Sequence, residues 1–116
     1  MRHVPKEWGM EIWLVNNELY CSKKLFLEPG WKCSLHRHMK KDETFTVEHG
    51  SCRLEIANEE GVLQDYLLNV GDSMRIPPGT WHRFRLPRYA PICVILETST
   101  NHDEADVERM EPSGRA

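Results

Sequence analysis

The sequence has no apolar run close to the roughly 18 residues that a membrane-spanning helix needs, and no apolar segment near its start that would mark a secretory signal. Its four cysteines show no C-x-x-C spacing, so we expect small buried thiols in place of disulfides. It also lacks a basic stripe of the kind that binds nucleic acid. These absences favour a cytoplasmic protein whose partner is neither a membrane nor a nucleic acid.

Length and charge divide the chain into two parts. The 116 residues suffice for one domain with its own hydrophobic core. The formal net charge of −3 arises within residues 101–116, which carry five acidic and two basic side chains, whereas residues 1–100 are balanced. We therefore expect a folded domain over residues 1–100 and a polar acidic C-terminal extension over residues 101–116.

Short segments of alternating apolar and polar residues follow one another along most of the chain. Glycine and proline interrupt them roughly every 8 to 12 residues, as in an all-β sandwich or barrel. Helical periodicity is weak and confined to residues 102–110. The pattern predicts an all-β fold.

Three histidines are placed by this alternation on inward faces of strands. Successive side chains of a strand point to opposite sides, so His36 and His38 share a face, and His82 shares one with Phe84. Glu43 follows on the next strand. Imidazole and carboxylate together suit one divalent ion of Zn, Fe, Mn, Ni, Co or Cu. An isolated H-x-H pair, however, is more often two half-buried polar residues than a metal site.

Two spaced motifs surround these residues. The first reads G-x5-H-x-H-x4-E-x6-G and the second G-x5-P-x-G-x2-H; their members are Gly30, His36, His38, Glu43, Gly50, Gly71, Pro77, Gly79 and His82. Together they resemble the two motifs of the cupin superfamily. The resemblance implies a small antiparallel jelly-roll barrel that holds one metal ion through His36, His38, Glu43 and His82.

Further stretches narrow the resemblance within that superfamily. "KEWGMEIWL", "MRIPPGTWHRF" and "ETSTNHDEADVERME" resemble the cupin domain of type II mannose-6-phosphate isomerases and related sugar isomerases. This implies a metal-dependent isomerase or epimerase that acts on a sugar or a sugar phosphate. Two alternatives stay open: an Fe(II) dioxygenase, and a non-enzymatic, metal-stabilised cupin that binds sugar or regulates.

An aldose–ketose isomerase needs a base that moves a proton between two carbons. The candidates are Lys23, which shares strand parity with Leu25, and Glu97 at the end of an apolar strand. Glu43 is a third candidate if it does not bind the metal. Lys23 could instead be a surface lysine, and Glu97 could face an arginine of a neighbouring subunit. Four basic residues could hold a phosphate near a pocket mouth at residues 39–42: Arg37, Lys40, Lys41 and Arg109.

An apolar segment near the start of the chain bears on the oligomeric state. Residues 11–16 read "EIWLVN", which a monomer would leave exposed at a sheet edge. We therefore expect a homodimer.

Overall fold

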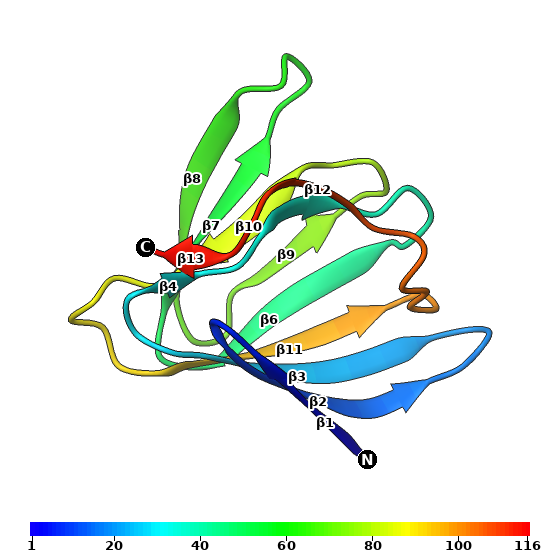
Figure 1. The fold of residues 1–116 in the computed structure, drawn as a ribbon, viewed down its shortest axis with the longest axis horizontal. Coiled ribbons are helices and arrows are strands. Elements are labelled where there is room, and N and C mark those ends of the chain that lie inside the picture. The colour runs from blue at the N-terminus through cyan, green and yellow to red at the C-terminus, as the bar shows by residue number, and fades with distance from the viewer.

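The computed structural model describes all 116 residues as thirteen β-strands without a helix, arranged in two antiparallel sheets (Figure 1). The first sheet has the order β1 (Arg2–Lys6), β2 (Gly9–Asn16), β3 (Cys21–Leu27), β11 (Cys93–Ser99), β6 (Glu43–His49) and β9 (Ser73–Ile76). The second has the order β12 (Glu108–Glu111), β5 (Leu35–Arg37), β10 (His82–Arg85), β4 (Trp31–Lys32) and β13 (Gly114–Arg115). β7 (Cys52–Ala57) pairs with β10 and with β8 (Leu63–Leu68). The predicted all-β fold is confirmed, and no helix offers the length and apolar character that a membrane crossing requires.

The inward side chains of the central strands β3 and β11 are apolar along one part of the strands and charged along another. Their register places Leu25 opposite Ile95, and Lys23 opposite Glu97. All four side chains are buried. Residues opposite one another in an antiparallel pair project from the same face. The inward face of these two strands therefore contains both apolar core residues and buried charged residues.

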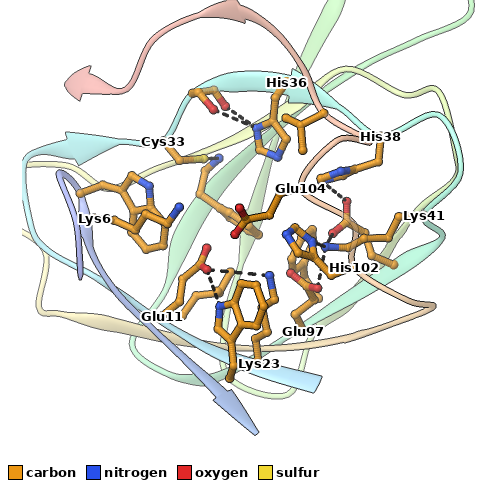
Figure 2. Close-up of a pocket in the computed structure, with 18 of the residues that line it drawn as sticks. Lys6, Glu11, Lys23, Cys33, His36, His38, Lys41, Glu97, His102 and Glu104 are labelled. Atoms are coloured by element: carbon orange, nitrogen blue, oxygen red, sulfur yellow. Dashed lines mark hydrogen bonds and ion pairs between the residues drawn. The ribbon is translucent and has the colours of Figure 1, made fainter. Parts of the chain in front are cut away.

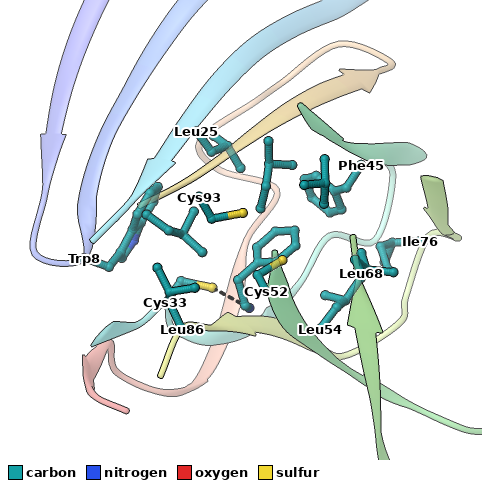
Figure 3. Packing of buried hydrophobic residues seen from close by; sticks show 14 residues of the cluster. Trp8, Leu25, Cys33, Phe45, Cys52, Leu54, Leu68, Ile76, Leu86 and Cys93 are labelled. Carbon is teal, nitrogen blue, oxygen red and sulfur yellow. Dashed lines mark hydrogen bonds between the residues drawn. The ribbon is translucent and has the colours of Figure 1, made fainter. Parts of the chain in front are cut away.

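The apolar part is a cluster of fourteen buried residues contributed by both sheets (Figure 3). Phe45 and Phe84 meet edge to face with ring centroids 4.6 Å apart. Burying a side chain of this size stabilises the fold by about 1.5–3 kcal/mol. All four cysteines are free and buried, which confirms the expected thiols.

The turn between β6 and β7 shows why one motif residue is glycine. Gly50 has a φ of 72°, a conformation that side chains other than glycine rarely adopt. A Cβ atom at this position would lie 2.6 Å from the carbonyl oxygen of Ile92. Gly50 therefore lets the chain turn tightly against the segment before β11.

Residues 101–116 contain a turn at residues 104–106, followed by two short strands that pair with the second sheet. β12 pairs with β5 and β13 with β4, and the backbone N–H of Ala116 donates to the carbonyl of Gly30 at 2.9 Å. The weak helical periodicity of residues 102–110 is therefore misleading, because the backbone of this segment bonds to neighbouring strands.

The edge of the first sheet differs from the one expected. Residues 11–16 belong to β2, and β1 pairs with β2 only over residues 9–13. Residues 11–13 are therefore not at a free sheet edge, whereas β1 does not pair with residues 14–16. The homodimer stays a prediction.

Candidate metal centre and adjoining pocket

Three histidines meet at one end of the space between the sheets. His36 on β5 lies opposite His82 on β10, and His38 follows directly after β5. One ring nitrogen from each lies within 4.8 Å of the others, so the cluster could hold a metal ion. Alternation along β5 and the β5–β10 pairing bring these side chains together.

Backbone carbonyls fix the orientation of all three rings. Nδ1 of His36 lies 2.7 Å from the carbonyl oxygen of Ser34. Nδ1 of His38 lies 2.8 Å from the carbonyl oxygen of Asp106, and Nδ1 of His82 lies 2.9 Å from that of Thr80. A carbonyl oxygen only accepts, so each Nδ1 carries the proton and each Nε2 presents a lone pair. This is the arrangement that supports histidines as metal ligands.

Glu43, at the start of β6, lies beside this cluster. Its Oε2 is 3.2 Å from Nε2 of His82 and 3.7 Å from Nε2 of His38. The Oε2 atom of Glu43 and the Nε2 atom of His82 are buried without a hydrogen-bond partner. Each such atom costs about 1–3 kcal/mol when unsatisfied, and a cation between them would satisfy both. The residues present therefore fit a divalent ion.

The protonation states also suit a cation. Burial, with a smaller contribution from His82, lowers the pKa of His36 to about 3. Burial lowers the pKa of His38 too, although Glu43 opposes the shift. For Glu43, burial alone would raise the pKa, but His82 and Lys41 outweigh it and bring the pKa below its usual range. Neutral imidazoles beside an ionised carboxylate are the ligand forms that bind metal.

Lys41 connects Glu43 to a second buried carboxylate. Its Nζ lies 2.8 Å from Oε2 of Glu97 and 3.6 Å from Oε1 of Glu43. Glu97 also accepts a hydrogen bond from Oγ of Ser99 at 2.9 Å. Burial alone would lower the pKa of Lys41, but Glu97 and Glu43 raise it above the ordinary lysine value. Glu97 thus points inward and binds Lys41; the alternative of an outward-facing glutamate is not what the structure shows.

Lys23 lies inside the protein, as its strand parity predicts. Its side chain is only 2% exposed, which excludes the alternative of a surface lysine. Nζ sits 4.0 Å from the ring centroid of Trp13 and 3.8 Å from Oε1 of Glu11. Burial lowers the pKa of Lys23 below its usual value, against the opposing effect of Glu97. Of the two buried lysines, Lys23 is the one that loses its proton more readily.

These groups line a pocket with a volume of about 280 Å³ (Figure 2). His36, His38 and Lys41 lie on one side of it, and Lys23 and Glu11 on another. Trp13 also lines it, whereas His82 does not. Lys6 and Arg109 also line it, and neither makes an ion pair or a hydrogen bond. Arg37, expected near a phosphate, instead pairs with Glu108 and packs on Trp81.

Two residues of the C-terminal segment belong to this site, and the sequence analysis did not anticipate either role. Asp106 accepts hydrogen bonds from the backbone N–H groups of residues 39–41 and offers its carbonyl oxygen to His38. Nδ1 of His102 lies 3.0 Å from Nζ of Lys41. Burial and the Lys41 charge lower the pKa of His102 to about 3. These contacts join segments more than sixty residues apart in the sequence, so no local sequence pattern predicts them.

The fold and the site define a small antiparallel β-barrel protein with an inward three-histidine cluster that could hold a metal ion. The chain belongs to the cupin family, because the pattern of the Cupin domain matches residues 24–97. Among solved structures it resembles oxalate decarboxylase of Bacillus subtilis, with a TM-score of 0.80 and 21% identity over 94% of this chain and 30% of that one. It also resembles the capsular polysaccharide assembling protein CapF of Staphylococcus aureus, with a TM-score of 0.81 and 17% identity over 95% of this chain and 34% of that one. At these identities the likeness shows the fold alone.

Curated relatives include sugar isomerases. The D-lyxose/D-mannose isomerase of Thermosediminibacter oceani is 32% identical over 80% of this chain and 63% of its own length. The D-lyxose ketol-isomerase of a Thermofilum species is 32% identical over 86% of this chain and 68% of its own length. The mannose-1-phosphate guanylyltransferase of Sinorhizobium fredii is 24% identical over 95% of this chain but only 21% of its own length. The chain therefore spans less than two thirds of the first and about a fifth of the last.

Proposed function

We propose that this protein is a metal-dependent isomerase or epimerase of a sugar or sugar phosphate. One observation carries the proposal: the candidate ligands His36, His38 and Glu43 line the same pocket as two buried lysines. His36, His38, Glu43 and His82 would hold one divalent ion. When bound, such an ion supplies a Lewis acid that polarises a carbonyl oxygen.

Lys23 is the base in this proposal. Isomerisation removes the proton from the carbon beside the carbonyl and returns it to the neighbouring carbon. The lowered pKa of Lys23 makes its neutral amine accessible, and that amine can take up the proton and give it back. Oε2 of Glu97, the other candidate, is engaged by Lys41 and Ser99. Glu97 therefore serves to hold Lys41 in place.

A sugar is the proposed substrate because curated relatives of the chain are named as D-lyxose isomerases. The unpaired Lys6 and Arg109 at the pocket offer positive charge for a phosphate. Lys6→Ala and Arg109→Ala should then raise KM for a phosphorylated sugar while leaving KM for the free sugar unchanged. An equal effect on both sugars would assign no phosphate contact to these residues.

The two alternatives predict different experiments. Oxygen uptake by the Fe(II)-loaded protein would support the dioxygenase. A metal-loaded protein that binds sugar without turning it over would support the binding cupin. Neither alternative calls for an amine base, whereas the isomerase gives a role to the lowered pKa of the buried Lys23.

Metal analysis followed by a sugar screen tests the proposal. The purified protein is stripped of metal, reloaded with each candidate ion, and incubated in D₂O with pentoses, hexoses and their phosphates. We expect deuterium at C1 or C2 of one sugar, together with its isomer, and only with metal present. A metal-replete protein that exchanges no proton in any of these sugars would refute the isomerase.

A further inference from the structure

His102 is held at the pocket wall by contacts to its backbone and to its ring. The side chain of Asn16 forms two hydrogen bonds with the His102 backbone, accepting from its N–H at 2.9 Å and donating to its carbonyl at 3.0 Å. The ring packs edge-on against Trp13 with centroids 5.1 Å apart, and Nδ1 lies 3.0 Å from Nζ of Lys41 (Figure 2). These contacts hold a histidine that lies in a loop between two strands.

Lys41 determines which nitrogen of this ring carries the proton. An ammonium group has three N–H donors and no acceptor. The three acceptors around Nζ of Lys41 are Glu97, Glu43 and Nδ1 of His102. Nδ1 must therefore accept, which places the ring proton of the neutral imidazole on Nε2. Nε2 of His102 makes no hydrogen bond within the protein, so this N–H is free to serve a ligand in the pocket.

The donor lies close to the candidate metal centre. The ring centroids of His102 and His38 are 6.0 Å apart, and both side chains line the same pocket. A sugar bound in this pocket could place its carbonyl oxygen between the histidine cluster and Nε2 of His102. A neutral imidazole can donate to an oxygen that gains negative charge and keep its own proton.

We infer that His102 is a catalytic residue of the proposed isomerase, donating a hydrogen bond from Nε2 to the substrate oxygen on which negative charge develops. The inference rests on the proposed function. As the base takes the proton from carbon, the electron pair of that C–H bond moves toward the carbonyl oxygen. His102 stabilises this oxygen through its hydrogen bond and keeps its own ring proton. The base carries the proton from one carbon to the other, and the former carbonyl oxygen gains the proton that the neighbouring sugar hydroxyl loses as it becomes the new carbonyl.

The tautomer can be measured without any turnover. In ¹⁵N-labelled protein near neutral pH, the His102 ring should show a protonated Nε2 and an unprotonated Nδ1, in both metal-free and metal-loaded samples. The signals are assigned by their loss in His102→Gln. A ring protonated at Nδ1 would overturn the inference, because Lys41 would then not be donating to it.

Variants separate a catalytic donor from a structural residue. His102→Leu should lower kcat by about 10²–10³-fold, the loss expected for one oxyanion donor, with metal content and melting temperature unchanged. His102→Gln can place an amide N–H near the position of Nε2 and should retain a larger share of kcat. His49→Leu, at an exposed histidine outside the pocket, serves as the matched control and should turn over normally.

The outcomes distinguish a failure of the role inferred for His102 from a failure of the proposed isomerase function. If the wild type isomerises a sugar and His102→Leu keeps full kcat, the inference fails and the isomerase stands. If His102→Leu and His102→Gln lose activity equally and also lose metal or stability, His102 is structural and the inference fails. If the wild type exchanges no sugar proton, the proposed function and the catalytic role of His102 are overturned together.

Discussion

Lys41→Met should destabilise the protein strongly, because it removes the cation that binds two buried carboxylates. Methionine keeps the length of the side chain and discards its charge. Glu97, 4% exposed, would lose its partner at 2.8 Å, while in metal-loaded protein Glu43 would keep the metal ion. Breaking one side of a buried ion pair typically costs about 3–5 kcal/mol. We expect a loss of this size in the free energy of unfolding near pH 7.

A pH series identifies the cause of that loss. A carboxylate left alone in a buried site has a pKa above the unfolded value of about 4.3. The folded variant then binds a proton more tightly than the unfolded chain does, so its deficit is full above the folded pKa and shrinks as the pH falls toward it. Urea unfolding of metal-loaded protein, followed by tryptophan fluorescence at about pH 7 and about pH 5, should show the deficit narrowing at the lower value.

The double variant Lys41→Met/Glu97→Gln completes the cycle. Neutralising the stranded carboxylate should recover about 0.5–3 kcal/mol relative to the sum of the single losses, the range seen for residues in contact. A Lys41→Met deficit below about 1 kcal/mol would refute the reasoning. So would a deficit that is independent of pH and additive with Glu97→Gln.

Three further predictions concern the metal, the base and the assembly. His82→Ala should lose metal and activity together, whereas Lys23→Ala should keep its metal and slow both turnover and sugar proton exchange by about 10²–10⁴-fold; full activity in Lys23→Ala would move the base elsewhere. Because burial lowers the pKa of Lys23 below 10.5, kcat/KM should rise with pH as Lys23 loses its proton, with an apparent pKa below that value; a rate independent of pH would argue against an amine base. Light scattering should report a homodimer, and a 13.6 kDa particle at micromolar concentration would contradict it.

Strand parity was sufficient to place much of the candidate site from the sequence. His36, His82 and Lys23 lie on strands, where side chains alternate strictly, so their inward direction follows from local pattern alone. Register then decides which inward residues meet, and the pairing of Lys23 with Glu97 depends on how β3 and β11 align. Sequence alternation does not specify that alignment.

Loop residues escaped this reasoning. Lys41 and His102 lie outside the strands, where no period fixes the direction of a side chain, and their contact spans 61 positions. Asp106 lies in a segment whose acidic composition suggested a solvated extension, yet its side chain accepts three backbone N–H groups of another loop. Composition describes the average environment of a segment, and a single carboxylate can depart from it.

The hydrogen bond between His38 and the carbonyl oxygen of Asp106 has a consequence for the order of folding and metal binding. His38 takes its ring orientation from a carbonyl 68 residues further along the chain, in a segment that leaves the ribosome after all four candidate ligands have emerged. Until that segment docks, His38 lacks the carbonyl that orients its ring, so a nascent chain has all four candidate ligands but not their final arrangement. Metal binding would then follow docking of the C-terminal segment, and a retained metal ion would indicate a fully folded protein.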